Sequence, residues 1–439
     1  MKKIAVISLG CDKNRIDTEH MLYRIAQKGY SVSDVKDADV IIINTCAFIE
    51  SARSESIETI LECAELKKAG KCEKIIVTGC LPQKYREELI DELPEADAFL
   101  GAFEYDKITD IIEGLSDRSN ESEAENFDAA ENTPRLLTTF PHVAYLKIAE
   151  GCNNRCTFCT IPSIRGGYRS RRAADIVAEA EGLVNDGVKE LILVAQDVTR
   201  YGEDIGDSLI SLLTELERLD VKIRLLYCYP EKVTDALIDK IASSDKIVNY
   251  IDVPVQHVSD KILKLMNRRT TGADIRALTD KLHARGITVR TTLMVGFPNE
   301  TETEFGELCD FVRSAKPEYA GIFAYSKEDG TAAARLGGQV KKSEKIKRVK
   351  ILGEIATAVT REFGGSLVGK TVDVLYEDID FDKNMFMGRA EFQAPDVDGR
   401  VYFTAAEADV GKVYKVKITD SDDYDLYGEA VAAADGECQ

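Results

Sequence analysis

The first part of the chain alternates short apolar runs with longer amphipathic or polar stretches. Residues 4–11, 39–46 and 74–80 read IAVISLGC, DVIIINTC and KIIVTGC, and stretches such as 51–70 between them have the length and composition of helices. Apolar runs separated by helical segments indicate βαβ units. Residues 1–115 are therefore predicted to form a domain around a parallel α/β sheet.

A second alternating series begins near residue 140. Its six β-like runs are spaced by segments long enough for one helix each, at residues 143–151, 189–197, 222–230, 250–256, 288–298 and 319–326. Six units are fewer than the eight of a complete barrel, so residues 136–366 are predicted to form a partial (β/α)6 barrel. The preceding residues 116–135 are polar, acidic and poor in large apolar side chains, which predicts a linker.

The pattern changes once more after a charged, predicted helical stretch at 341–369. Short alternating runs broken by Gly, Asp and Asn follow at residues 371–378, 385–392, 399–406 and 412–420. Residues 367–439 are therefore predicted to form a small antiparallel β-barrel of the OB-like kind.

Composition narrows the cellular setting. The opening residues MKKIAVISLGC imitate a lipoprotein signal, but the apolar run Ile4–Leu9 is shorter than the roughly 7–15 residues of such a signal and fits a first strand. No stretch approaches the roughly 20 apolar residues that span a bilayer, so a cytoplasmic protein without membrane contact is expected.

In the reducing cytoplasm, eleven cysteines favour metal ligation or redox chemistry over disulfides. The net charge of −20 disfavours a nucleic-acid duplex and suits a basic protein partner.

Three cysteines lie within eight residues, directly after the first predicted barrel strand: Cys152, Cys156 and Cys159. Loops after the strands carry the active site of such barrels. Structural zinc usually takes four ligands in two pairs, and no second CxxC pair is present. Thiolate-rich sites otherwise favour iron–sulfur clusters, which normally take four cysteines. Three cysteines would leave one iron open to a small molecule.

A second triplet is spread over the first domain. Cys11, Cys46 and Cys80 each stand directly after one of its three predicted strands. Carboxyl ends of parallel strands share one edge, so these cysteines could converge there. The alternative is that they are ordinary small residues at strand ends, since free cysteine is commonly buried. That ordinary interpretation is preferred for the five other cysteines, Cys63, Cys72, Cys228, Cys309 and Cys438.

The CxxxCxxC spacing, with Phe158 directly before its last cysteine, resembles the radical S-adenosylmethionine (SAM) family. The whole chain is similar to the methylthiotransferases of that family, which have an N-terminal cluster domain, a radical SAM barrel and a C-terminal TRAM domain. The resemblance implies two 4Fe-4S clusters. One, on Cys152, Cys156 and Cys159, would bind SAM and cleave it to a 5′-deoxyadenosyl radical. The other, on Cys11, Cys46 and Cys80, would carry or donate the inserted sulfur.

The resemblance also places further residues at SAM. Gln196 and Asp197 fall where the family contacts the amino end of SAM, and Gln256 lies at a later strand end that holds the ribose and adenine. Considered without the family, a Gln-Asp pair after a strand is more often a turn or helix cap. His257, next to Gln256, is by default a structural histidine. The segment SIRGGYRSRR contains four arginines, Arg165, Arg169, Arg171 and Arg172. They suit either a solvated loop or a site that binds the substrate or the SAM carboxylate.

The family divides into enzymes that thiomethylate adenosines in transfer RNA and a branch that modifies an aspartate of small-subunit ribosomal protein twelve. Residues 366–439 contain 7 Lys and Arg against 17 Asp and Glu, which would repel RNA and attract a basic protein. Segments such as SLGCDKNRIDTE and AQDVTRYG are similar to the ribosomal-protein branch, although that branch often has proline in place of Asp12. Direct transfer-RNA binding is therefore not expected.

The implied reaction is β-methylthiolation of that aspartate with two SAM molecules, one as methyl donor and one as radical source. A radical suits this step because the C–H bond is unactivated and no protein base deprotonates it usefully near neutral pH. Implied partners are ribosomal protein twelve, free or in its subunit, an electron donor such as flavodoxin or ferredoxin, and a sulfur donor. The alternatives are a transfer-RNA adenosine methylthiotransferase and a non-catalytic, metal-stabilised binding or electron-transfer protein.

Overall fold

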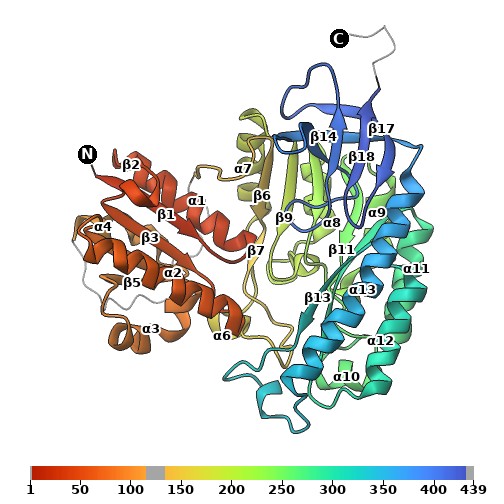
Figure 1. Ribbon diagram of the computed structural model, residues 1–439, viewed down its shortest axis with the longest axis horizontal. Helices are drawn as coiled ribbons and strands as arrows, with labels where there is room; N and C mark the ends of the chain where they lie inside the picture. The colour runs from red at the N-terminus through yellow and green to blue at the C-terminus, as the bar shows by residue number, and fades with distance from the viewer. Residues whose placement is uncertain (1, 115–133, 432–439) are drawn as a thin grey trace.

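The computed structural model describes residues 2–114 and 134–431, which are arranged around three main β-sheets (Figure 1). The predicted linker 116–135 lies, except for its last two residues, outside the described residues, as does Cys438. Among the described residues, no helix combines the length and hydrophobicity needed to cross a membrane.

The N-terminal domain is a five-stranded parallel sheet with helices on both faces, as predicted. Its strand order is β2-β1-β3-β4-β5. The strands are β1 (Lys3–Ser8), β2 (Ser31–Val32), β3 (Val40–Thr45), β4 (Lys74–Gly79) and β5 (Ala98–Gly101). The helices are α1 (Asp12–Gln27), α2 (Glu50–Lys68), α3 (Cys80–Glu92) and α4 (Ile108–Glu113). The edge strands β2 and β5 were not predicted because they are only two and four residues long.

The strand order of this sheet reverses between β1 and β3. The connection from β1 runs out to β2 on one side, and the chain then returns to β3 on the other side. Such a switch point opens a crevice at the carboxyl ends of the strands. The loops after β1 and β3 flank that crevice.

The central domain is a six-stranded parallel sheet of order β6-β9-β10-β11-β12-β13, which confirms the predicted partial barrel. The strands are β6 (Val143–Lys147), β9 (Glu190–Val194), β10 (Lys222–Leu225), β11 (Ile247–Asp252), β12 (Thr288–Val295) and β13 (Tyr319–Ala324). The helices are α6 (Ile161–Ile164), α7 (Ala173–Asn185), α8 (Leu209–Leu216), α9 (Asp235–Ser243), α10 (Asp260–Leu265), α11 (Gly272–Ala284), α12 (Glu302–Ala315) and α13 (Lys342–Leu367). A two-stranded ribbon joins β7 (Ala149–Glu150) to β8 (Arg169–Ser170).

Alternate residues of the central strands enter different cores. On β6, Ala144 and Leu146 pack with the surrounding helices, while Val143 and Tyr145 belong to the core on the opposite face. That second core is completed by Ile16 from α1 and Ala394 from the C-terminal domain. Both flanking domains therefore pack on the inner face of the partial barrel.

The C-terminal domain is a closed five-stranded barrel of order β14-β15-β16-β18-β17. Its strands are β14 (Thr371–Asp380), β15 (Met385–Ala390), β16 (Val401–Thr404), β17 (Val413–Ser421) and β18 (Leu426–Ala430). The pairing is antiparallel, as predicted, except between β16 and β18, which run parallel. The strand β18, which sequence analysis did not predict, closes the barrel by pairing with both β16 and β17.

Candidate active site

The structure brings Cys11, Cys46 and Cys80 together at the carboxyl edge of the N-terminal sheet. Cys11 follows β1 and precedes α1, Cys46 follows β3, and Cys80 is the first residue of α3. Burial, and then the nearby Cys11, raise the pKa of Cys46. Burial raises the pKa of Cys80 to about 12, with Cys11 and Cys46 adding to it and Arg165 opposing. The three thiols therefore lie close enough to influence one another's pKa values.

Asn14, in the first turn of α1, ties the three loops together. Its Nδ2 donates to the carbonyl of Leu9 at 3.1 Å and of Thr45 at 2.9 Å. Its Oδ1 lies 3.6 Å from the Sγ of Cys80 and accepts from Arg165 at 2.5 Å. Sequence analysis missed Asn14 because nothing in its local pattern distinguishes it from a surface residue of a helix.

Cys152, Cys156 and Cys159 share the loop between β7 and α6. The backbone N–H of Asn154 donates to the Sγ of Cys152 at 3.5 Å, and that of Ile161 to the Sγ of Cys159 at 3.4 Å. Hydrogen bonds to sulfur tune cluster potentials. Burial raises the pKa of Cys152 to about 11 and that of Cys159 to about 12.

Cys156 has two neighbours that sequence analysis did not identify. Arg268 approaches its Sγ at 3.7 Å, and the hydroxyl of Tyr229 lies 3.8 Å from the same atom. The Arg268 guanidinium stacks over the Tyr229 ring at 4.2 Å, and its Nε is buried without a hydrogen-bond partner in the described structure. Both residues come from distant loops, so no local signal connects them with Cys156.

The donor chemistry of both triplets fits an iron–sulfur cluster. Among the described residues, no three His, Cys, Asp or Glu side chains are close enough to hold a single ion. In a 4Fe-4S cluster each cysteine binds a different iron, so its ligands stand around a cube rather than around one point. The N–H donors at the sulfurs of Cys152 and Cys159 suit that arrangement in their triplet.

The loops that carry the two triplets meet at the interface between the N-terminal and central domains. The hydroxyl of Thr160, next to Cys159, donates at 3.3 Å to the carbonyl of Phe48, two residues after Cys46. Arg165 crosses the same interface to pair with Asp17 of α1 at 3.0 Å. The loops that carry the two triplets are therefore in direct contact.

A buried charge network supports this interface. Arg165 also pairs with Glu150 at 3.1 Å, and Lys147 pairs with Asp17 at 2.6 Å. These four side chains are almost fully buried. Charges removed from water need such partners. Arg165 is thus not part of a solvated loop, and neither is the buried Arg171, whereas Arg172 is exposed.

The residues predicted to contact SAM lie at the ends of central strands. Gln196 follows β9, and its Nε2 donates to Glu150 while its Oε1 is buried without a partner in the described structure. That oxygen fits a donor such as an ammonium group. Gln256 follows β11 with φ +69°, and its carbonyl accepts from Met294 of β12 at 2.7 Å. Phe158 packs edge to face on Phe297, with ring centroids 6.4 Å apart.

Asp197 acts as a helix cap. Its carboxylate accepts from the backbone N–H of Thr199 at 3.1 Å, capping the short helix Val198–Arg200, and from Asn154 at 2.7 Å. Arg200 lies 3.3 Å from it. Because Asp197 joins the loop after β9 to the loop of Cys152, it positions both, and its predicted contact with SAM stays a prediction.

His257 and the four described cysteines outside the triplets have contacts typical of structural residues. The Nδ1 of His257 accepts from the backbone of Ser259 at 3.0 Å, and its Nε2 lies 3.5 Å from Glu300. Cys63, Cys72, Cys228 and Cys309 are buried, and none of them belongs to either triplet.

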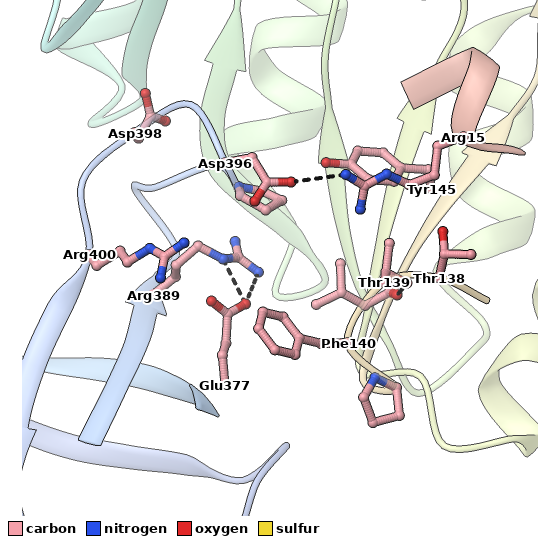
Figure 2. Close-up of a pocket in the computed structure, with 13 residues that line it drawn as sticks. Arg15, Thr138, Thr139, Phe140, Tyr145, Glu377, Arg389, Asp396, Asp398 and Arg400 are labelled. Carbon is pink, nitrogen blue, oxygen red and sulfur yellow. Dashed lines mark hydrogen bonds and ion pairs between the residues drawn. The ribbon is translucent and has the colours of Figure 1, made fainter. Parts of the chain in front are cut away.

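One cavity of about 350 Å³ lies elsewhere, between α1, the start of β6 and the C-terminal barrel. Figure 2 shows Arg15 reaching toward Asp396 on one side and Glu377 paired with Arg389 on the other. None of the six cysteines of the triplets lines this cavity.

Comparisons with known proteins cover the whole architecture. Residues 3–101 match a model described as uncharacterized protein family UPF0004, residues 146–312 the radical SAM superfamily, and residues 368–431 the TRAM domain. The chain is 46% identical to ribosomal protein uS12 methylthiotransferase RimO of Geotalea uraniireducens (strain Rf4), over 98% of both proteins. It is 45% identical to the protein of the same name from Geobacter sulfurreducens, over 98% of this chain and 99% of that protein.

Among solved structures, the radical SAM methyltransferase TsrM of Kitasatospora setae, with cobalamin and a [4Fe-4S] cluster bound, aligns with a TM-score of 0.54 and 14% identity. The alignment covers 74% of this chain and 75% of TsrM. The cobalamin-dependent SAM radical enzyme OxsB aligns with a TM-score of 0.53 and 13% identity, over 82% of this chain and 58% of OxsB. At these identities the likeness concerns the fold alone.

Proposed function

This chain belongs to the radical SAM methylthiotransferase family that includes the RimO proteins, and from that membership we propose that it methylthiolates an aspartate of ribosomal protein uS12 at the β-carbon. The enzyme uses an iron–sulfur cluster and SAM. The proposal adds a second 4Fe-4S cluster and a second SAM molecule. It rests on one observation above all, the direct contact between the loops that carry the two cysteine triplets at a single domain interface.

In this proposal, Cys152, Cys156 and Cys159 would hold a cluster that provides radical chemistry with SAM, and Cys11, Cys46 and Cys80 would hold a cluster that provides the sulfur. Gln196, Asp197, Gln256 and Phe158 line the SAM site. The orphaned Oε1 of Gln196 accepts a hydrogen bond from SAM. Asn14 and Arg165 hold the two cysteine loops at a fixed separation.

The acidic C-terminal domain suits the proposed substrate. Its exposed acidic side chains include Asp373, Asp409 and Asp420 on β14, β17 and an adjoining loop. An acidic surface steers a basic ribosomal protein toward the enzyme and repels RNA phosphates. An external electron donor, such as flavodoxin or ferredoxin, and a sulfur donor complete the proposed partners.

The test is an anaerobic turnover with reconstituted enzyme, SAM, sulfide and reductant. One reaction contains a uS12 loop peptide with the target aspartate, and a parallel reaction contains a transfer-RNA anticodon stem-loop. The expected result is a mass gain of about 46 Da on the peptide, from replacing H by SCH3. The same gain on the RNA alone would refute the proposed substrate and establish the transfer-RNA alternative.

A further inference from the structure

Lys13, in the first turn of α1, is a buried lysine whose direct contacts in the described structure are a carbonyl and an aromatic ring. Its side chain is 7% exposed. The Nζ donates to the carbonyl of Ala195 at 3.4 Å and lies 3.5 Å from the centroid of the Tyr227 ring. In the described part of the chain, no carboxylate comes within 4 Å of it, whereas Lys147 and Arg165 each have two. A buried charge is costly unless paired, so this ammonium is suited to an anionic ligand.

Lys13 is close in sequence to one cysteine of the N-terminal triplet and contacts strand ends near the other triplet. It follows Cys11 by two residues, and Ala195 directly precedes Gln196. Tyr227 is two residues from Tyr229, whose hydroxyl is 3.8 Å from the Sγ of Cys156. Lys13 therefore links the loop of one triplet to the strand ends that surround the other.

Tyr227, which packs against Lys13, has an unusual backbone conformation. Tyr227 has φ +61°, which is uncommon for an aromatic residue, and such strain concentrates at functional sites. Its N–H donates to Asp252 at 3.0 Å and its hydroxyl to Asp12 at 2.9 Å. These contacts keep the Tyr227 ring against the ammonium of Lys13.

Two acidic groups contact Tyr227 beside Lys13, and one of them, Asp252, has an oxygen without a hydrogen-bond partner in the described structure. Asp12 accepts the Tyr227 hydroxyl, and Asp252 accepts the Tyr227 N–H and lies 4.0 Å from Arg290. Burial raises the pKa of Asp252 to about 6, and Arg290 and, more weakly, Lys13 oppose that rise. Neither forms an ion pair with Lys13 in the described structure. A carboxylate from a ligand would complete the partners of this ammonium.

We propose that Lys13 binds the side-chain carboxylate of the substrate aspartate and so places its β-carbon between the two triplets. This inference rests on the proposed function, because only an aspartate substrate brings that carboxylate to the site. An adenosine offers no carboxylate, so Lys13 also selects for a protein substrate. SAM carries a carboxylate too, and the experiment separates the two sources.

The experiment measures peptide binding to anaerobically reconstituted holoenzyme with SAM and without reductant. The probes are a labelled uS12 loop peptide with its target aspartate and the same peptide with asparagine there. Wild type is expected to bind the aspartate peptide about tenfold more tightly, which corresponds to about 1.4 kcal/mol. Lys13→Met is expected to bind both peptides equally, at the asparagine level. Lys13→Gln, which keeps a donor for Ala195, is measured in the same way in case Lys13→Met does not fold.

Lys36→Met is the matched control, because Lys36 is an exposed lysine of the same domain and is expected to leave the preference intact. The Kd for SAM is measured in each variant and is expected to stay within twofold of wild type. An unchanged peptide preference in the neutral Lys13 variants would overturn the inference, and a SAM-binding defect with unchanged preference would assign Lys13 to SAM. If wild type modifies only the RNA stem-loop, the proposed function fails and this inference fails with it.

Discussion

Replacing Glu190 with Gln tests how the C-terminal barrel is held on the central domain. Glu190 begins β9 and is buried between two guanidiniums, Arg224 on β10 and Arg389 on β15, each at 2.6 Å. Arg389 also pairs with Glu377 at 2.7 Å. The Glu190→Gln side chain keeps nearly the same shape but removes the charge that both arginines share.

The structure sets the magnitude of the effect. Burial alone would raise the pKa of Glu190, but Arg224 and Arg389 outweigh it and lower the pKa from 4.5 to about 2. That difference corresponds to about 3 kcal/mol of folding free energy near neutral pH. Breaking a buried ion pair by removing one partner costs about 3–5 kcal/mol, which agrees. The ion pair between Glu190 and Arg389 joins the central domain to the C-terminal barrel, so its share of this free energy stabilises the domain interface.

The assay is amide hydrogen exchange followed by mass spectrometry, since a multidomain chain does not unfold in one step. Amides of β15 and β16 are expected to exchange about 10- to 100-fold faster in the variant, because docking of the barrel is weakened. Glu65→Gln is the control, since it removes an exposed charge paired with Lys68 at 2.8 Å and is expected to leave these amides unchanged. Exchange in β15 and β16 within threefold of wild type would refute the reasoning.

Four further predictions follow from the same structure. Cys156→Ala is expected to abolish 5′-deoxyadenosine production, measured by chromatography, and retained production would remove that triplet from SAM cleavage. Cys46→Ala is expected to keep SAM cleavage and lose the methylthiolated peptide, so normal product by mass spectrometry would contradict a second cluster. Gly79→Ala is expected to lower the unfolding midpoint and the iron content, because Gly79 has φ +97° and an added Cβ would lie 2.6 Å from the carbonyl of Thr45. The contribution of Glu190 to stability is expected to be complete above pH 4.5 and to vanish as the pH falls toward 2, and protection factors of the β15 and β16 amides in Glu190→Gln should lack this component.

Local patterns in the sequence determined the architecture and the first triplet. Helices and strands each have a characteristic spacing of apolar residues, which is visible within the element itself. The βαβ units, the six central strands and the short strands of the C-terminal barrel could therefore be identified without knowing what they pack against. Cys152, Cys156 and Cys159 lie in one loop, and their spacing alone indicates a common site. Very short strands such as β2 carry too few residues to show a period.

The tertiary structure decided which distant side chains meet. The sequence placed Cys11, Cys46 and Cys80 after three strands, but their convergence depends on the strand order, in which β3 lies beside β1. The sequence also left open whether Arg165 is solvated, and domain packing buries it against Asp17 and Glu150. Hydrophobic periodicity reports which face of an element is buried, whereas the partner of a buried charge depends on how whole domains dock. That is why a buried, unpaired cation such as Lys13 could be recognised only in the folded chain.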